Sequence, residues 1–462
     1  MMNQEPDAIT GFLPAFQSYD EALSFLYKAI DYEKLINYQY NASTFSLDRM
    51  EKLLANIGNP HKGLPCIHIT GTKGKGSTAI MLSTILEHAD LNTGLFTSPH
   101  LIDLRERIQI NHQKISEQGF TRIINELRPY THHLRETAPS ASPTFFEILT
   151  AVSMLYFKKE QIEMAVLEVG LGGRLDSTNV VIPHVSIITN VGLDHTAILG
   201  DTLSSIAYEK AGIIKQRVPV VSGVEAPDAL SVVVKTCKEK DAPLYLLDRD
   251  IWVEDVQAVN RNDTRGLMCK IKTWRHTYSN IFLPLVGTHQ AKNCALSLGA
   301  LEVLRDRGYV SIDDDTIREA LATLYCPARI EVVAKNPFII LDFAHTVESM
   351  QFLKKTLLEN FQFNKLILIL GFSQDKDLNN ILKEIIEEGD FIVVTRSKNP
   401  RAAPPEDLHQ RIEKLCGKQS KVVDTIQSAI ITARQVASKE DLICVTGSAY
   451  LAGEAKQVLC CR

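Results

Sequence analysis

Short runs of apolar residues alternate with amphipathic stretches along the chain, and this alternation predicts a mixed α/β fold. In the first half of the chain the apolar runs lie at 67–69, 164–169 and 185–189. Strands that are apolar throughout are typical of a parallel sheet that helices cover on both faces. The stretches 18–58 and 144–157 carry apolar residues at helical spacing, and we expect such stripes, which include Ile30, to lie in the core.

The second half of the chain repeats this pattern after an interruption. Between 215 and 285, short β-like runs alternate with polar turns, so we expect a small β subdomain at an edge. Further apolar runs follow at 338–341, 366–370, 391–394 and 442–445. A chain of 462 residues exceeds what one hydrophobic core usually organises. We therefore predict two α/β domains, 1–286 and 287–462.

Composition and charge exclude several classes of protein. The net charge is −5, which argues against the broad basic surface that nucleic-acid-binding proteins carry. The nine cysteines form no repeated Cys-x-x-Cys pair, which argues against a zinc framework or a disulfide scaffold. No apolar run approaches the roughly 18 residues of a membrane span, and the N-terminal residues do not form a signal peptide. We expect a cytoplasmic monomer that binds neither nucleic acid nor membranes.

A glycine-rich turn follows the first apolar run and reads Gly71-Thr72-Lys73-Gly74-Lys75-Gly76-Ser77. Glycines let backbone N–H groups converge on an anion, to which a lysine and the N-terminus of the next helix add positive potential. The turn differs from a Walker A motif, because Ile69 occupies its first glycine position and Gly76 the position of its Mg²⁺-binding hydroxyl. We expect the phosphates of ATP to bind here; a turn without a ligand is the alternative.

Polar residues at the ends of neighbouring apolar runs are candidates for binding the Mg²⁺ that accompanies ATP. Glu168 ends one run, His195 follows another, and Ser98 follows a further short strand. A carboxylate at the rim of a parallel sheet needs a cation or a hydrogen-bond partner, and Mg²⁺ usually takes few protein ligands. The alternatives are an ion pair between Glu168 and Arg174, a structural histidine, and a simple Ser-Pro turn.

The second domain offers three further candidates. Asp342 and His345 follow the run 338–341, and ligands of open α/β sheets bind beyond the carboxyl ends of the strands. Arg329 suits phosphate because its planar guanidinium can bond two oxygens at once. All three could face a nucleotide across a cleft between the domains.

Taken together, these motifs resemble the folylpolyglutamate synthase and dihydrofolate synthase family of Mur-type amide ligases. The matching segments occur in the family's order at 69–78, 97–101, 106–108, 168–176, 194–196 and 209–212. The resemblance extends from about Tyr19 to Val458. It implies a central Mur-ligase-type P-loop domain, a Rossmann-like C-terminal domain, and ATP in the cleft between them.

The resemblance also implies roles for individual residues. For ATP it implies Thr72, Lys73, Gly74, Lys75, Gly76 and Ser77 on the phosphates, Asn293 near adenine, and Arg329 and Asp342 completing the site. For two Mg²⁺ ions it implies Ser98, Glu168 and His195. For the pterin or folate pocket it implies Thr144, Phe145, Leu175 and Ser177. Lys75, Lys210 and His345 are implied to be catalytic, with Lys210 carbamylated; a plain lysine paired with Glu209 or a phosphate is the alternative.

Two motifs of the second domain depart from the family. The chain has Asp342-Phe343-Ala344-His345-Thr346-Val347 where the family has Asp-Gly-Ala-His-Asn-Pro, and Pro327-Ala328-Arg329 where it has Pro-Gly-Arg. We expect Phe343 to exclude a backbone conformation that only glycine tolerates, so that nucleotide contacts in this domain differ.

The implied reaction is the ATP-dependent addition of L-glutamate to dihydropteroate, to a folate, or to both. ATP phosphorylates the acceptor carboxylate, and the amino group of glutamate attacks the acyl phosphate. A Mur-type ligase acting on another carboxylate is one alternative, although fewer than 70 residues before the glycine loop leave little room for an extra domain. A non-catalytic nucleotide-binding homologue is the other.

Overall fold

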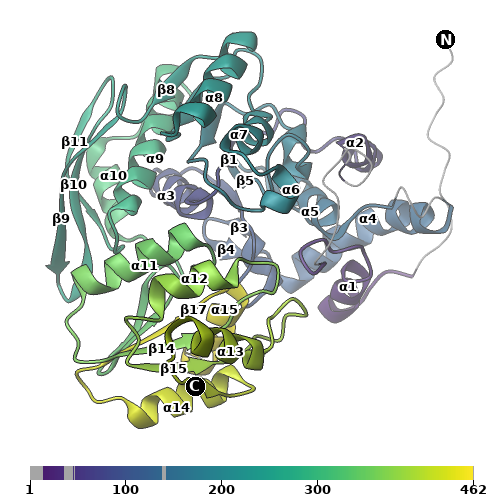
Figure 1. The fold of residues 1–462 in the computed structure, drawn as a ribbon. Helices are drawn as coiled ribbons and strands as arrows, with labels where there is room; N and C mark the ends of the chain where they lie inside the picture. The colour runs from purple at the N-terminus through teal and green to yellow at the C-terminus, as the bar shows by residue number, and fades with distance from the viewer. Residues whose placement is uncertain (1–13, 36–44, 46, 138–141, 461–462) are drawn as a thin grey trace, which may run out of the picture.

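The structure is a computed structural model that describes residues 14–35, 45, 47–137 and 142–460. The N-terminal residues that we examined for a signal peptide lie outside these ranges. Two sheets organise the chain into two lobes, drawn one above the other in Figure 1. No helix within the described ranges is apolar over a length that could cross a bilayer.

The sheet of the first lobe has eight strands in the order β4-β3-β2-β5-β1-β6-β7-β8. Its strands are β1 (Cys66–Thr70), β2 (Thr93–Phe96), β3 (Ile108–Ile110), β4 (Gln113–Lys114), β5 (Met164–Glu168), β6 (Val185–Ile188), β7 (Val220–Ser222) and β8 (Leu244–Leu246). The six strands from β2 to β8 in that order pair in parallel, and β3 and β4 add an antiparallel edge. The apolar runs predicted as strands in this region are therefore confirmed.

Helices cover both faces of this sheet, as the alternation of apolar runs predicts. They are α1 (Tyr19–Leu26), α2 (Leu47–Asn56), α3 (Lys75–His88), α4 (Glu117–Thr137), α5 (Phe145–Lys159), α6 (Thr196–Leu199), α7 (Leu203–Ala211) and α8 (Pro227–Glu239). Alternate side chains of a strand point to opposite faces, so Ile67 and Ile69 join the core with α3 whereas Cys66 joins the core with α4 and α5. Ile30 was expected in the core but lies beyond α1 and is 51% exposed.

The β subdomain is smaller than the pattern at 215–285 predicts. Its beginning supplies β7 and β8, which extend the main sheet, and only β9 (Trp252–Arg261), β10 (Thr264–Lys272) and β11 (Thr277–Leu283) form a separate antiparallel sheet. This separate sheet packs on α9 (His289–Asp306) and α10 (Asp314–Ala322), which also contact α3.

The packing of α9 and α10 bears on the boundary between the two lobes. We predicted a boundary after residue 286, which would place both helices in the second domain. Their apolar side chains instead share one core with β1 and α3, and this core continues to Cys326. We therefore propose that the first lobe extends to about residue 327.

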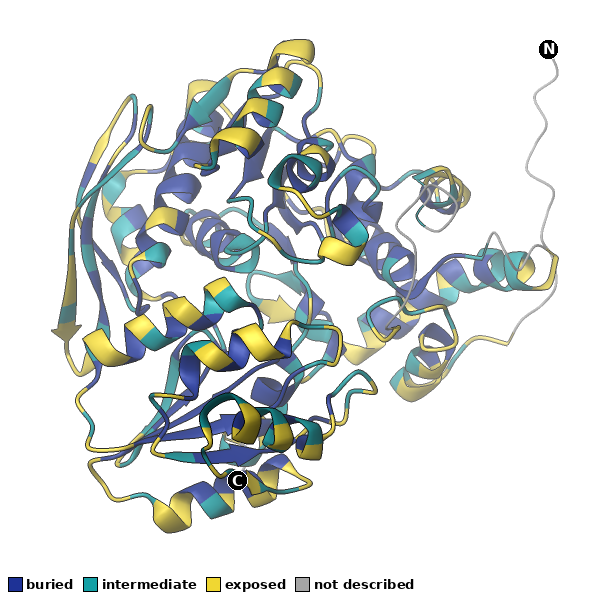
Figure 2. Ribbon diagram, viewed as in Figure 1, coloured by how far each residue is buried: buried dark blue, intermediate teal, exposed yellow. Residues whose placement is uncertain are grey.

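The second lobe contains a six-stranded sheet in the order β12-β13-β17-β14-β15-β16. Its elements are β12 (Glu331–Lys335), β13 (Phe338–Leu341), α11 (Val347–Asn360), β14 (Leu366–Leu370), α12 (Leu378–Ile385), β15 (Phe391–Val394), α13 (Pro405–Cys416), β16 (Lys421–Val422), α14 (Ile426–Val436), β17 (Leu442–Thr446) and α15 (Ala449–Cys460). Only β12 runs antiparallel. The four predicted strands are β13, β14, β15 and β17, and Figure 2 shows them buried beneath half-exposed helices.

Arg265 of β10 joins the small sheet to the second lobe. Its guanidinium lies over the rings of Phe338 and Phe361, at 5.3 and 5.0 Å from their centroids. It also donates a hydrogen bond of 2.6 Å to the carbonyl of Asn360. The two lobes are thus held together at the end of the small sheet, away from the glycine loop.

We expect Arg265→Ala to lower the free energy of unfolding by about 1–2 kcal/mol, because it removes two cation–π contacts and one hydrogen bond. Urea unfolding followed by circular dichroism measures this change. Arg261→Ala is a matched control, since Arg261 lies over Phe282 within the same small sheet at 5.7 Å. Equal losses in the two variants would contradict a role for Arg265 between the lobes.

Candidate active site

The carboxyl ends of four neighbouring parallel strands bring the predicted site residues of the first lobe together. Ser98 follows β2, Glu168 ends β5, Gly71 follows β1 and Asn190 follows β6. These strands are adjacent in the order β2-β5-β1-β6, so their ends meet at one edge of the sheet. Ligands of open α/β sheets bind at such an edge, as the sequence predicts.

Two glycines of the loop lie so close to neighbouring side chains that no other residue would fit. A Cβ atom on Gly71 would lie 1.8 Å from the hydroxyl of Thr189, and φ at this glycine is +154°. A Cβ atom on Gly74 would lie 2.4 Å from the side-chain oxygen of Asn293, at a φ of +82°. Asn293 of α9 therefore packs directly on the loop, and its place beside the nucleotide stays a prediction.

Some backbone N–H groups of the glycine loop are hydrogen-bonded within the protein, and others are available to a ligand. The side-chain oxygen of Asn190 accepts hydrogen bonds from the backbone N–H groups of Thr72 and Lys73, at 3.1 and 2.9 Å. We expected these two N–H groups to bind phosphate, and in this structure they are occupied. The first N–H groups of a helix have no partner within the helix, so the start of α3 at Lys75 offers the remaining donors.

Asp194 is the centre of an ion-pair cluster that joins the two lobes. Its carboxylate accepts from the ammonium of Lys73 at 2.9 Å and from that of Lys376 at 3.2 Å. His345 of the second lobe lies 3.8 Å from the same carboxylate and 3.4 Å from Lys73. Burial raises the pKa of Asp194, but these cations outweigh it and hold the pKa well below its ordinary value.

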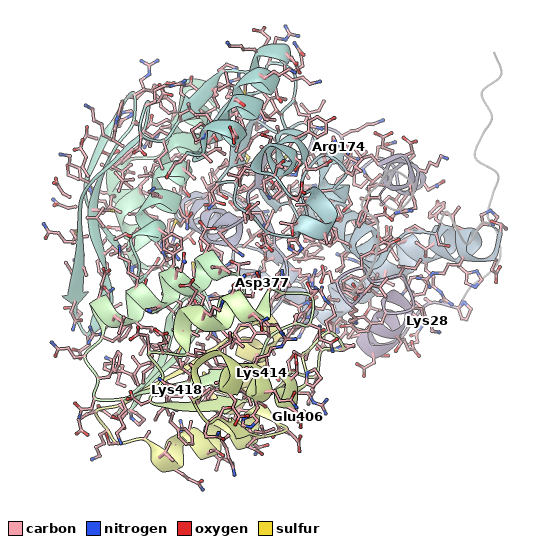
Figure 3. The ribbon with its side chains drawn as sticks, in the orientation of Figure 1. Lys28, Arg174, Asp377, Glu406, Lys414 and Lys418 are labelled. Carbon is pink, nitrogen blue, oxygen red and sulfur yellow. The ribbon has the colours of Figure 1, made fainter. Side chains whose placement is uncertain are left out.

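Glu168 lies beside Gly76 of the glycine loop. Among the described residues its carboxylate accepts one hydrogen bond, 3.0 Å long, from the backbone N–H of Ser98. Burial raises the pKa of Glu168, and the charges of Lys75 and Arg329 oppose that shift in part. The alternative of an ion pair with Arg174 is wrong: Arg174, labelled in Figure 3, pairs with Glu209 at 2.8 Å.

His195 precedes α6 and has a left-handed backbone, with φ of +51°. Burial lowers the pKa of its imidazole to about 4, so the ring is neutral near pH 7 and offers a nitrogen lone pair. The described residues include no group of three His, Cys, Asp or Glu side chains placed to hold a metal. A metal bound by Ser98, Glu168 and His195 would therefore need oxygen ligands from a nucleotide or from water.

Two cavities meet at the glycine loop. The first has a volume of about 280 Å³, and the second, of about 530 Å³, extends towards α9. The predicted residues lining the first are Thr72, Lys73, Gly74, Lys75, Gly76, Ser98, Thr144, Glu168, Leu175, Ser177, His195, Arg329 and His345. Those lining the second are Lys73, Gly74, Ser77, Asn293, Arg329, Asp342 and His345. The structure thus brings together residues that are up to about 270 positions apart in the chain.

Phe145 is the predicted pocket residue that the structure places elsewhere. It is 2% exposed, lies in the core and stacks on the partly exposed Tyr27, whereas the next residue, Phe146, lines the first cavity. Thr144 lines the cavity but also caps α5 by accepting from the backbone N–H of Glu147. Successive helical residues point about 100° apart, so a one-residue error moved the prediction from cavity to core.

Lys210 lies in a small cavity of about 30 Å³ beside Lys75, Asp194 and His195. It is 4% exposed, and burial together with the charge of Lys75 lowers its pKa well below the ordinary lysine value. The alternative partner, Glu209, is instead engaged with Arg174. Lys210 is therefore a buried amine that loses its proton more readily than an exposed lysine.

In the second lobe Asp342 ties two loops together. Its carboxylate accepts from the backbone N–H of Ile330 at 3.1 Å and from that of Ala344 at 2.7 Å. The strained positions lie at Ala328 and Ile330, which have φ of +52° and +53°, whereas Phe343 has no positive φ. Phe343 thus excludes a glycine-only backbone, as expected, and a left-handed backbone lies at Ala328, where the family's Pro-Gly-Arg has glycine. The expected difference in nucleotide contacts stays a prediction.

Known proteins resemble this chain over most of its length. The Mur ligase middle domain matches residues 69–301, and the glutamate ligase domain of Mur ligases matches residues 328–449. The dihydrofolate synthase/folylpolyglutamate synthase of Bacillus subtilis (strain 168) is 34% identical over 414 residues, which cover 89% of this chain and 94% of that protein. The chain belongs to the folylpolyglutamate synthase and dihydrofolate synthase family.

Solved structures of this family share the fold over nearly the whole chain. A folylpolyglutamate synthase of Mycobacterium tuberculosis, in complexes with ADP and AMPPCP, superposes with a TM-score of 0.84 at 31% identity and covers 90% of this chain and 96% of its own. An FPGS–AMPPCP–folate complex superposes with a TM-score of 0.82 at 29% identity and covers 96% and 100% of the two chains. The predicted Mur-type two-domain α/β fold is therefore confirmed.

Sequence reasoning missed several residues that line the first cavity. Lys376 follows β14, Arg401 follows β15, and Tyr450 follows β17. Each comes after a predicted strand of the second domain, which was the signal that could have identified it. Asp194 was noted only as the neighbour of His195, because its ion pairs with Lys73 and Lys376 join segments that are far apart in sequence.

We expect Glu168→Gln to raise the thermal midpoint of the ligand-free protein. Burial raises the pKa of Glu168, so the folded state binds a proton more readily than the unfolded state, and stability falls as the pH rises above the ordinary value of 4.5. The gain from glutamine should be largest at about pH 8 and should shrink towards about pH 5 in differential scanning fluorimetry.

Glu147→Gln is the matched control. Glu147 is also buried, but it receives hydrogen bonds of 2.8 and 2.6 Å from Arg49, so loss of its charge should lower the midpoint. A lower midpoint in both variants would show that Glu168 is compensated in the folded protein and would contradict the prediction.

Proposed function

We propose that this protein is an ATP-dependent ligase that adds L-glutamate to dihydropteroate, to folates, or to both. The observation that carries the proposal is the junction of the two cavities, where both share Lys73, Gly74, Arg329, Phe343 and His345 as lining residues. A transferable phosphate placed there would meet a nucleotide on one side and an acceptor on the other. Relatives that cover 89% and 90% of the chain are named dihydrofolate synthase/folylpolyglutamate synthase and folylpolyglutamate synthase.

The larger cavity suits the nucleoside of ATP. It is lined by Asn293 and His289 of α9, and burial lowers the pKa of His289 to about 4, which leaves an uncharged imidazole. Asn293 donates to Gln290 at 3.0 Å, so its amide is oriented before any ligand binds. Amide and imidazole groups can hydrogen-bond a purine without adding charge. We infer that the base of ATP lies against this end of α9.

The smaller cavity suits an acceptor that is aromatic at one end and anionic at the other. Phe146 and Tyr32 line it from the first lobe, whereas Lys376 and Arg401 line it from the second. A pterin ring can pack on aromatic side chains, and basic side chains match the carboxylates of glutamate or a folate. The same cavity lies open to Lys75 of the phosphate loop, as acyl transfer from ATP requires.

Mg²⁺ fits the donors at the loop. Glu168 is a buried carboxylate with one hydrogen-bond donor among the described residues, His195 is a neutral imidazole, and Ser98 lines the same cavity. Oxygen-rich sites that leave room for phosphate and water are typical of Mg²⁺. We propose that these three residues hold the metal. When bound, Mg²⁺ would neutralise phosphate charge.

The residues of the junction would act mainly by position and charge. Lys75 donates to the carbonyl of Gly71 at 3.0 Å, which holds its ammonium across the loop opening. Arg329 brings a second cation from the other lobe. Negative charge moves from ATP to the acyl phosphate during transfer, and fixed cations placed along that path stabilise it. No covalent bond to the protein is needed.

We propose that Lys210 carries a carbamate. A neutral amine adds CO₂ and releases one proton, which leaves an anionic carbamate, and burial favours the neutral amine at this position. The modified side chain would turn a cation beside Lys75 into an oxygen donor for a second Mg²⁺.

The decisive experiment incubates the purified protein with ATP, Mg²⁺ and L-glutamate, in parallel with dihydropteroate and with tetrahydrofolate. Mass spectrometry of the products identifies the acceptor and the number of glutamates added. A Mur-type ligase for another carboxylate would form neither product but would bind ATP. A non-catalytic homologue would show no glutamate-dependent release of ADP with any acceptor.

We expect Lys75→Ala to lower kcat by at least about a hundredfold, because it removes one preorganised cation from the transferring phosphate. Steady-state ADP release measures this effect. Lys215→Ala is the control, since Lys215 is a partly buried lysine that donates to the carbonyl of Asn179 outside the three cavities. If the Lys75 variant changed only the KM for ATP, Lys75 would be a binding residue and not a catalytic one.

For Lys210 we expect a carbamate signal in the NMR spectrum of protein grown and kept in isotopically labelled bicarbonate. Lys210→Arg should lack the signal. Lys210→Ala should be inactive and should recover activity when short carboxylic acids are added, because they can replace the lost carboxylate. An unmodified Lys210 in bicarbonate, together with no rescue, would contradict the proposal.

A further inference from the structure

Arg329 is presented to the junction of the two cavities by an unusual turn. The residues on either side of it, Ala328 and Ile330, have left-handed backbones with φ of +52° and +53°. Such conformations are costly for residues with a Cβ atom, above all for a β-branched one, and persist only where surrounding bonds maintain them.

Two carboxylates maintain this turn. The backbone N–H of Ala328 donates to Glu331 at 2.8 Å, and that of Ile330 donates to Asp342 at 3.1 Å. Glu331 is in turn paired with Lys456 at 2.9 Å. The backbone of Arg329 is therefore fixed on both sides, and its side chain projects towards the cavities that it lines.

The guanidinium of Arg329 makes no hydrogen bond to a described residue. Burial lowers the pKa of Arg329 from its ordinary value, and the charges of Asp342 and Glu168 oppose that shift in part. The guanidinium packs on the ring of Phe343, since its central carbon lies 3.8 Å from the centroid of that ring. Phe343 stands where the family motif has glycine.

Contact with a ring face leaves the hydrogen-bonding edge of a guanidinium free. All five N–H donors lie in the plane of the group, so a ring placed against its face orients that plane without using a donor. An arginine side chain otherwise loses about 2 kcal/mol of rotamer entropy when a ligand orders it. Phe343 removes part of this cost before phosphate arrives.

Phe343 is also connected to His345. The imidazole donates from Nδ1 to the carbonyl of Phe343 at 2.8 Å, and the two rings are nearly parallel, at an angle of 12°. Burial lowers the pKa of His345 well below its ordinary value, so the other nitrogen faces the ammonium of Lys73 as an acceptor. The position of Phe343 therefore affects two residues at the junction.

We propose that Phe343 is a positioning residue, whose ring holds the Arg329 guanidinium at the junction so that its N–H edge meets the phosphate of the bound nucleotide. The inference rests on the proposed function, because it takes the ligand at the junction to be ATP. It assigns to this chain a stacking platform that a glycine in the same motif would not provide.

A double-mutant cycle on nucleotide binding tests the proposal. Isothermal titration calorimetry with AMPPCP compares the wild type with Phe343→Leu, Arg329→Ala and the double variant. We expect Phe343→Leu to weaken binding roughly five- to tenfold in the wild type and less than about twofold when Arg329 is already alanine. Phe343→Tyr keeps the aromatic face and should bind within about twofold of the wild type.

The control is Phe282→Leu, which removes a buried phenylalanine under Arg261 in the small sheet and should leave binding unchanged. Equal losses from Phe343→Leu in the two backgrounds, or a tyrosine variant as weak as the leucine one, would overturn the proposal. If Phe343→Leu weakened AMPPCP binding only when Arg329 is present, but the protein formed no glutamylated product, the ligase function would be overturned and this inference would stand.

Discussion

The carboxylate of Asp194 binds one lysine from each lobe, and the arrangement of the site depends on this contact. Lys73 comes from the phosphate loop and Lys376 from the loop after β14. Cations at a partly buried junction are costly unless an anion lies among them. Asp194 supplies that anion in the ligand-free protein and at the same time sets the two lobes in register. Phosphate groups of a nucleotide would add further negative charge to the same place.

Burial governs the protonation of the groups around this contact. Glu168, Lys210 and His345 all have pKa values shifted towards their neutral forms, because each lies away from water. Asp194 is the exception, since its cationic neighbours outweigh its burial. Titratable groups with opposed shifts in one cleft are characteristic of a site that binds charged ligands. The site therefore combines an ion-paired cluster around Asp194 with buried groups whose pKa values are shifted towards the neutral form.

The second lobe contributes a strained but well-supported turn. Left-handed backbones at Ala328 and Ile330 aim Arg329 at the cleft, and Asp342 accepts N–H groups from the loops on either side of it. Two of the positions that depart from the family motifs adjoin this arginine: Ala328 has one of the left-handed backbones, and the ring of Phe343 packs against the guanidinium.

Local patterns in the sequence determined the strands, the glycine loop and the residues at the strand ends, because apolar periodicity and turn chemistry act over a few residues. They also led to the family, whose motifs are contiguous segments. The tertiary structure alone decided that α9 and α10 belong to the first core, that Phe146 and not Phe145 faces the cavity, and that Asn190 occupies two loop N–H groups. It also decided the pairing of Asp194 with Lys376, 182 positions apart. Such contacts arise from the packing of distant segments, which no local pattern encodes.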